Sequence, residues 1–458
     1  MRFMLCRVTL IDIQVKGGRA NVVDCFAKTT IIAHGMKDYS CDARVEYKPF
    51  LYRLGRPKDH EIDLLFFGSI VYSIDKLVPR SEGDDNWQRS LNIKLPVANP
   101  VLWGQASQML KKALRFLTGD NWEFEFVART KRLWYPLHRT PPTLPPFPKS
   151  AISCVSLFSG GLDSLVGVID VLEEQNGQVL CVSHHDQSGA LSDQDRLLGA
   201  LKNKYPRRLH PIQAYVGTSD GNNETSFRSR SVVFLTLGTY CASRRGLDEL
   251  LVPENGMIAL NPPLTPSRRG SCSTRTAHPY FLSTFQKALH KLGFNISFQN
   301  PYQFKTKGEI AEGCKNLTFL KKVALESVSC AKRGRRMQWL RRTKDVRACG
   351  MCIPCLYRRA ALHRINLDTE VYGRDVLTGE LDVGSGLKHT QHDFRDLISF
   401  LAEPHDVASV RRLLVAGGVS DFEHLSDYAE MVLCAKSELL TWMYNKAPAH
   451  KLRAWGLP

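Results

Sequence analysis

The sequence lacks the features of membrane, repeat and low-complexity proteins. It contains no apolar run long enough to span a bilayer, no internal repeat and no segment of strongly biased composition. Its first residues, Met1 to Arg7, do not resemble a signal peptide, and its 13 cysteines are an odd number. We therefore expect a cytoplasmic protein in a reducing compartment, with no membrane partner.

Acidic residues are too few to balance the basic ones. Lysine and arginine number 62 against 45 for aspartate and glutamate, which gives a formal net charge of +17. This charge favours acidic ligands in general, so nucleic acid is one candidate partner beside ATP, a purine-like acid or an acidic protein. With 458 residues and 43% hydrophobic content, the chain is long enough for two or three domains with their own cores.

One short motif predicts a phosphate-binding loop. The apolar run 152–158 leads into Ser159-Gly160-Gly161-Leu162-Asp163-Ser164, and a helical pattern follows. Glycines let backbone N–H groups approach a phosphate, serine hydroxyls add donors, and a helix N-terminus favours anions. The loop has neither the Gly-Lys-Ser/Thr ending of the P-loop nor the glycine spacing of dinucleotide-binding folds. Asp163 suggests a bridging Mg²⁺ or a helix cap, and a plain Gly-Gly turn is the alternative.

A cysteine cluster predicts a metal site. Cys349, Cys352 and Cys355 follow one another at the spacing Cys-x₂-Cys-x₂-Cys, and Cys330 lies upstream as a fourth candidate ligand. Four thiolates around Zn²⁺ leave no open position, so such a site would be structural. An iron–sulfur cluster or a group of buried cysteines would give the same pattern.

The pattern along the chain predicts an α/β protein with extensions at both ends. Residues 1–138 show strand-like runs at 8–15, 62–67 and 122–127 and one helix at about 103–117, which indicates a β-rich N-terminal domain. Residues 139–150 form a proline-rich linker. Residues 151–366 alternate predicted strands (152–158, 179–183, 209–216, 296–298) with predicted helices (163–175, 191–204, 228–245, 277–293). This alternation is typical of a parallel sheet with helices on both faces, which binds ligands at the carboxyl ends of its strands. Residues 367–458 show helical periodicity at 393–402, 406–416 and 426–446.

The motif Ser-Gly-Gly-x-Asp-Ser resembles the PP-loop of the ATP pyrophosphatases. Together with the cysteine cluster and the following Arg358, it resembles the QueC family, which makes 7-cyano-7-deazaguanine. The segments 230–235 and 307–310 also resemble that family, so the resemblance covers about residues 151–364. Between 252 and 280 the sequence departs from QueC. There, the stretches 254–256, 260–263 and 273–279 are similar to the QueC-like proteins of bacterial anti-phage defence systems, the QatC group in particular.

The resemblance implies a PP-loop (adenine nucleotide α-hydrolase-like) fold with a four-cysteine zinc knuckle, and an ATP-dependent ligase or synthase. Such an enzyme adenylates a 7-deazaguanine carboxylate, releases pyrophosphate and passes the acyl group to an amine. It implies ATP, Mg²⁺ and structural Zn²⁺, and partners among other defence-system proteins that would dock on the N-terminal domain. We assign catalysis to Ser159, Asp163, Ser164 and Lys307, ATP binding to Phe158, Ser159, Gly160, Gly161, Leu162, Asp163, Ser164 and Arg230, substrate binding to Arg275 and His278, and metal binding to Cys330, Cys349, Cys352 and Cys355.

Other interpretations stay open. The acyl acceptor is either ammonia, which leads to an amide or nitrile, or an amine of a partner protein. The chain could instead be a PP-loop enzyme that modifies RNA, or a scaffold without catalysis. The basic segment 332–347, with Trp339, could be a solvated loop, a rim for an acidic partner or a stacking surface for RNA. His184 and His185 would lie at the same sheet edge as the phosphate loop.

Overall fold

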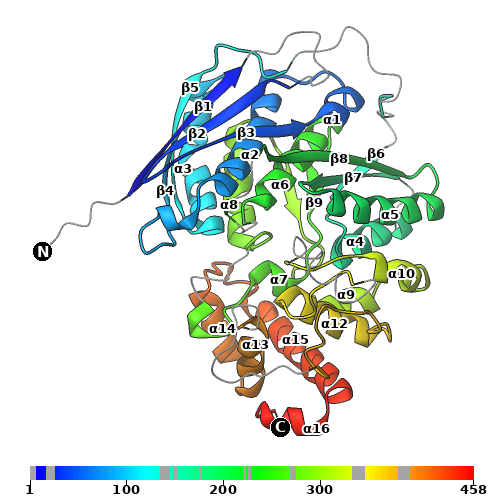
Figure 1. Ribbon diagram of the computed structural model, residues 1–458. Coiled ribbons are helices and arrows are strands. Elements are labelled where there is room, and N and C mark those ends of the chain that lie inside the picture. Colours follow the sequence, from blue (N-terminus) through cyan, green and yellow to red (C-terminus); the bar gives the residue numbers. More distant parts are fainter. Residues whose placement is uncertain are drawn as a thin grey trace, which may run out of the picture.

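A mixed sheet of ten strands runs through the protein (Figure 1). The structure, a computed structural model, describes residues 7–16, 26–134, 145–147, 152–174, 177–219, 223–224, 228–268, 275–332, 346–379 and 392–457. The strand order is β10-β9-β6-β7-β8-β3-β2-β1-β4-β5. The strands are β1 Val8–Lys16, β2 Lys28–His34, β3 Asp38–Glu46, β4 Ser90–Val97, β5 Asn121–Ala128, β6 Ile152–Leu157, β7 Gln178–His185, β8 Leu209–Thr218, β9 Glu249–Leu251 and β10 Ser297–Gln299.

Most neighbouring strands are parallel. The segment β10-β9-β6-β7-β8 is parallel throughout, and so are the pairs β1–β4 and β4–β5. The pairs β8–β3, β3–β2 and β2–β1 are antiparallel. The junction between the N-terminal strands and the central ones is the β3–β8 pair, whose register places Ala43 opposite Thr218 and Glu46 opposite Tyr215. One sheet thus contains strands from both sides of the predicted linker 139–150. The division into domains stays a prediction.

Helices cover both faces of the central strands. α2 (Asp59–Leu77) packs against α6 (Arg230–Arg245), and both lie on one face with α3 (Pro100–Thr118) and α8 (Pro279–Lys291). α4 (Leu162–Glu174) and α5 (Ser188–Lys204) contact β6, β7 and β8 on the other face. The short helices of the first 330 residues are α1 Lys48–Arg53, η1 Arg80–Glu82, α7 Gly256–Leu260, η2 Pro266–Arg268, α9 Lys307–Glu312, α10 Leu317–Val323 and η3 Ala324–Glu326. The predicted α/β class is therefore confirmed, but the sheet is mixed and largely parallel because three of its strand pairs are antiparallel.

The C-terminal region is helical, as predicted. It contains α13 His392–Ala402, α14 Val407–Ala416, α15 Leu425–Lys446 and α16 Ala449–Ala454. These helices share a buried apolar cluster with α12 (Ile353–Arg364) and the four cysteines. Figure 1 shows them at the end of the molecule opposite to β1–β5. Among the described residues, no helix combines the length and the apolar character that crossing a membrane requires.

One predicted strand is wrong. Residues 62–67 belong to α2, whose residues from Glu61 to Leu77 are all buried. A helix that is buried all round has no polar face, so its sequence shows no helical period and its apolar run looks like a strand. The N-terminal region therefore contains α1 and α2 in addition to the helix that we expected at 103–117, which is α3.

Candidate functional site

The predicted phosphate loop is a tight turn between β6 and α4. Gly160 has a φ of +82°, a left-handed conformation that favours glycine. A Cβ atom at this position would lie 3.2 Å from Cγ of Gln194. The backbone N–H of Val328 donates a hydrogen bond to the carbonyl of Gly160 at 2.9 Å. The turn is therefore shaped by its glycine and held by a segment more than 160 residues downstream.

Serine hydroxyls gather at the start of α4. Ser159 Oγ lies 3.3 Å from Ser164 Oγ, and it accepts a hydrogen bond from the N–H of Gly161 at 3.3 Å. The N–H of Leu162 donates to Oγ of Ser329, also at 3.3 Å. These three contacts are longer than ordinary hydrogen bonds, and they lie at a helix terminus whose N–H groups and dipole favour an anion. The Ser164 hydroxyl also donates to the carbonyl of Gly161 at 3.0 Å, so a phosphate would have to compete with these contacts for the two N–H groups and for the hydroxyls of the loop and of Ser329.

Asp163 faces the protein interior and makes a buried ion pair. Its Oδ1 lies 2.5 Å from Nζ of Lys307, and both side chains are almost fully buried. Its Oδ2 accepts hydrogen bonds from the backbone N–H of Asn255 at 3.2 Å and from Asn255 Nδ2 at 2.7 Å. The structure thus brings together two of the residues that we assigned to catalysis, and it adds Asn255.

A second carboxyl group lies beside Asp163. Burial favours a raised pKa for Asp163, but the Lys307 ammonium and hydrogen bonds from Glu254, Lys307 and Asn255 outweigh it, so the pKa lies below the ordinary value. Burial, followed by the charge of Asp163, raises the pKa of Glu254 well above its ordinary value. The raised pKa favours the protonated form of Glu254 beside the Asp163 carboxylate. Two carboxyl groups and one ammonium share this site.

Lys307 is positioned by the helix that it begins. Thr306 caps α9: its Oγ accepts from the N–H of Glu309 at 3.0 Å, and the Glu309 carboxylate accepts from the N–H of Thr306 at 2.7 Å. Glu438 of α15 then accepts from the Thr306 hydroxyl at 2.7 Å and from the N–H of Gly308 at 3.1 Å. The C-terminal region thus contacts the turn that carries Lys307.

Arg230 lies at the carboxyl end of β7, at the sheet edge where the phosphate loop begins. Its guanidinium donates to His184 Nδ1 at 3.3 Å and to the His184 carbonyl at 3.1 Å. Gln194 Nε2 donates to the same carbonyl at 3.1 Å and to the carbonyl of Ser159 at 3.3 Å. Burial, and then the charge of Arg230, lower the pKa of His184 to about 3, so the ring is neutral and its Nε2 donates to the carbonyl of Val216 at 3.0 Å. One polar network therefore joins Arg230 to the loop through Gln194.

Arg275 and His278 lie in a different environment. Arg275 stacks on the ring of Phe116 in α3, with its Cζ 4.3 Å from the ring centroid, and donates to the Phe116 carbonyl at 3.2 Å. His278 caps α8 by accepting from the N–H of Tyr280 at 3.2 Å. Burial, and then the Arg275 charge, lower its pKa to about 3, and its buried Nε2 has no hydrogen-bond partner in the described chain. Within the described ranges, no hydrogen bond or ion pair joins these two residues to the phosphate loop.

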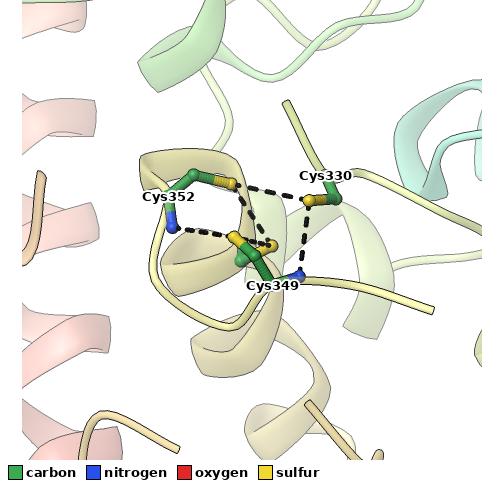
Figure 2. A group of neighbouring side chains, drawn as sticks. Cys330, Cys349 and Cys352 are labelled. Atoms are coloured by element: carbon green, nitrogen blue, oxygen red, sulfur yellow. Dashed lines mark hydrogen bonds between the residues drawn. The ribbon is translucent and has the colours of Figure 1, made fainter. Parts of the chain in front are cut away.

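The four cysteines form one cluster. Their sulfur atoms all lie within 4.8 Å of one another, and three pairs are separated by 3.3, 3.8 and 4.0 Å. Tetrahedral zinc with Zn–S bonds of about 2.3 Å requires sulfur separations of about 3.8 Å. Figure 2 shows Cys330 facing Cys349 and Cys352, which come from a different segment.

Backbone N–H groups surround the cluster. Lys332 and Cys349 donate to Cys330 Sγ, and Met351 and Cys352 donate to Cys349 Sγ, all at 3.3 to 3.4 Å. Gly350 has a φ of +77°, and a Cβ there would lie only 2.2 Å from the carbonyl of Arg374. N–H groups that donate to sulfur stabilise thiolates, and four thiolates are the ligands that a dication such as Zn²⁺ binds in a structural site. The cluster is consistent with a structural metal such as zinc, with all four predicted ligands present.

The cysteine cluster is connected to the phosphate loop. Arg358 of α12 donates to Ser327 Oγ at 2.7 Å and to the Ala324 carbonyl at 2.9 Å, and it forms an ion pair with Glu370. The same segment continues through Val328 and Ser329, which contact the phosphate loop as described, to Cys330. A metal that fixes Cys330 would therefore also fix its neighbour Ser329, whose hydroxyl accepts the hydrogen bond from the N–H of Leu162.

Several neighbours of the site escaped sequence reasoning. The sequence indicates Glu254 and Asn255 only through a family resemblance, and it carries no signal that places Gln194, Ser329 or Glu438 at the site. Glu254 follows β9, a strand of only three residues that pairs with β6, so it lies at the carboxyl edge of the sheet. Recognition of β9 would have placed it there. The basic residues 333–345, with Trp339, and most of the proline-rich linker lie outside the described residues.

Comparison with protein-family models gives no match, and comparison with curated proteins finds no similar sequence.

Proposed function

We propose that the protein is an ATP-dependent ligase or synthase of the PP-loop type that adenylates a carboxylate. The observation that carries the proposal is the glycine turn at the carboxyl end of β6, where serine hydroxyls and the N-terminus of α4 meet next to the buried Asp163–Lys307 pair. The resemblance to QueC supplies the substrate class, a 7-deazaguanine acid. The resemblance to QueC-like defence proteins supplies the biological setting.

The loop would hold the β- and γ-phosphates of ATP. The N–H groups of Gly161 and Leu162 and the hydroxyls of Ser159 and Ser164 would donate to the phosphate oxygens, and Arg230 would neutralise charge at the neighbouring strand end. The substrate carboxylate then attacks the α-phosphorus in line, and pyrophosphate leaves with the electrons of the broken P–O bond. An amine displaces AMP from the acyl-adenylate and forms an amide. That amine is ammonia or an amine of a partner protein.

The carboxyl groups suit the expected magnesium ion. Asp163 and Glu254 would hold Mg²⁺ through their oxygens if the charge of the ion displaced the proton of Glu254 and the Lys307 ammonium, and the ion would supply charge neutralisation between the phosphates. Lys307, already beside Asp163, is the cation that can exchange its ion pair for a contact with a phosphate. The cysteine cluster would hold structural zinc and take no part in the chemistry.

Pyrophosphate release tests the proposal. We expect release from ATP only when 7-carboxy-7-deazaguanine is present. Ser164→Ala should lower it strongly, while Ser188→Ala, at an exposed serine at the start of α5, should leave it unchanged. If no release depends on the acid, the assigned substrate is wrong. If no substrate causes any release, the scaffold interpretation replaces catalysis. Intact-mass measurement of co-expressed partner proteins then distinguishes a protein acceptor, which gains mass, from ammonia.

One observation weighs against an RNA-thiolating enzyme, which would use a reactive cysteine near the loop. Burial raises the pKa of Cys154 to about 12, and burial also raises that of Cys181 well above its ordinary value. Raised pKa values disfavour the thiolate, which is the nucleophilic form, so neither cysteine suits that role.

A further inference from the structure

A basic cavity lies at the beginning of α2, away from the phosphate loop. Its volume is about 280 Å³, and its lining residues are Arg56, Pro57, Lys58, Asp59, Ile62, Arg129, Arg132, Leu133 and Trp134. Asp59 is the first residue of α2, whereas Tyr72, thirteen residues later, donates to Asp186 at the phosphate-loop edge of the sheet. At 1.5 Å per helical residue the two places are about 20 Å apart. The cavity is therefore separate from the proposed ATP site.

The charges of the cavity are unbalanced. Arg129 pairs with Asp59 at 2.7 Å and with the buried Asp63 at 3.1 Å. Arg56, Lys58 and Arg132 make no ion pair within the described part of the chain, and all three are exposed at the cavity. The N-terminus of α2 adds its partial positive charge beside them. Three cations in one concave wall repel one another, and this repulsion is relieved when a multiply charged anion binds.

Trp134 offers a second, independent recognition group. Its indole Nε1 is buried and has no hydrogen-bond partner, whereas a buried indole N–H normally has one. The tryptophan is held at the cavity by its bridge to Phe26 and by the hydrogen bond from the N–H of Ala27 to the carbonyl of Leu133 at 2.7 Å. The ring of Trp134 lines the cavity next to arginines and can stack on a planar ligand, whereas its Nε1 is closed to solvent and would reach a ligand only if the side chain moved.

We propose that this cavity binds a nucleoside monophosphate group, in which a sugar carries both a phosphate monoester and a planar base. Arg56, Lys58 and Arg132 hold the phosphate, since arginine matches phosphate oxygens with paired N–H donors. Trp134 contacts the ring. The volume limits the ligand to about the size of one nucleotide, below the range of larger ligand pockets. A free mononucleotide and the 5′-terminal nucleotide of a nucleic acid share this chemistry.

Fluorine NMR of the full-length protein with fluorine-labelled tryptophan can test the site. The chain has 7 tryptophans, and Trp134→Phe identifies the resonance of Trp134. AMP should shift that resonance with half-saturation below about 1 mM. Adenosine, which lacks the phosphate, should not shift it. A short oligonucleotide with a 5′-phosphate that binds more tightly than AMP would assign the site to a nucleic-acid end, and equal or weaker binding would assign it to free nucleotide.

Matched charge reversals complete the test. Arg56→Glu and Arg132→Glu should each weaken AMP binding by about tenfold, whereas Arg411→Glu, at an exposed arginine of α14, should not. The shift should persist in Ser164→Ala, which separates this site from the proposed ATP site. The proposal is overturned if AMP up to about 10 mM leaves the Trp134 resonance unmoved, if adenosine acts as AMP does, or if the two reversals leave binding unchanged while thermal melting shows that they fold.

Discussion

Replacement of Lys307 by methionine tests whether the Asp163–Lys307 pair is a buried ionic contact on which the fold depends. The two side chains are 4% and 5% exposed, and their charged atoms lie 2.5 Å apart. Methionine fills much of the volume of lysine but carries no charge. Asp163 would keep its hydrogen bonds from Asn255 and Glu254 and lose its only partner of opposite charge among the described residues.

The expected cost follows from burial. Removing one partner of a buried ion pair costs about 3–5 kcal/mol, because the remaining charge stays in a medium that solvates it poorly. The surviving hydrogen bonds place Lys307→Met at the lower end, about 3 kcal/mol. Lys111 and Glu123 form a matched exposed pair at 2.8 Å, with side chains 33% and 60% exposed. Lys111→Met should therefore cost less than about 1 kcal/mol.

Urea unfolding of the two variants and of Asp163→Asn/Lys307→Met gives the measurement. The double variant removes the stranded charge and should recover most of the loss. In the wild-type protein the pKa of Asp163 is lowered, so the pair's contribution is present above the ordinary pKa of aspartate and is lost as the pH falls through the lowered value. In Lys307→Met, burial is no longer offset by the ammonium, so the pKa of Asp163 rises. The difference in unfolding free energy between wild type and Lys307→Met should therefore shrink below about pH 5. A loss under about 1 kcal/mol, or a double variant no more stable than Lys307→Met, would refute the reasoning.

Three further predictions concern the surroundings of the loop. Gly160→Ala places a side chain at a φ of +82° and against Gln194, so it should lower the free energy of unfolding in urea by about 1–2 kcal/mol. It should also weaken nucleotide binding in calorimetry. Gly199→Ala, in open space on α5, should have neither effect. Metal removal by a chelator, or Cys352→Ser, should lower the melting temperature and weaken nucleotide binding, because Cys330 is the neighbour of Ser329, which contacts the phosphate loop. Zinc analysis of the purified protein should find one ion per chain. Unchanged nucleotide affinity after metal loss would show that the cysteine cluster and the phosphate loop are independent. Glu438→Gln, on α15, replaces by a donor one of the two oxygens that accept from the start of α9, so it should cost about 1 kcal/mol in urea unfolding. Glu430→Gln, exposed on α15, should cost nothing measurable.

The sequence was sufficient to locate elements whose residues carry a local signal. The motif from Ser159 to Ser164 marks the strand–turn–helix junction because glycines and serines have distinct roles there, and the helices at 393–402, 406–416 and 426–446 have clear apolar periods. The run 62–67 was misread because α2 is buried all round. β9 has three residues, too few for a strand pattern, and without it the position of Glu254 could not be predicted.

Long-range contacts were beyond sequence reasoning. Asp163 and Lys307 are 144 residues apart, and nothing in either segment indicates that a lysine at the start of α9 meets a carboxylate in α4. Cys330 could be proposed as a ligand from its residue type, but its approach to Cys352 depends on the fold of the intervening chain. Arg275 and His278 were chosen for their chemistry in a polar segment. Their contacts with Phe116 depend on the packing of α8 against α3.

The pairing of β3 with β8 has a consequence for solubility. β8 lies between β7 and β3, and its outer edge pairs with β3 over residues 215–218, where the side chain of Val216 is fully buried. A chain shortened to begin after the N-terminal strands would leave the N–H and C=O groups at residues 215–218 of β8 without their partners in β3. Such an edge pairs readily with another copy of itself. The N-terminal strands thus protect the central parallel strands from self-association, whatever else they bind.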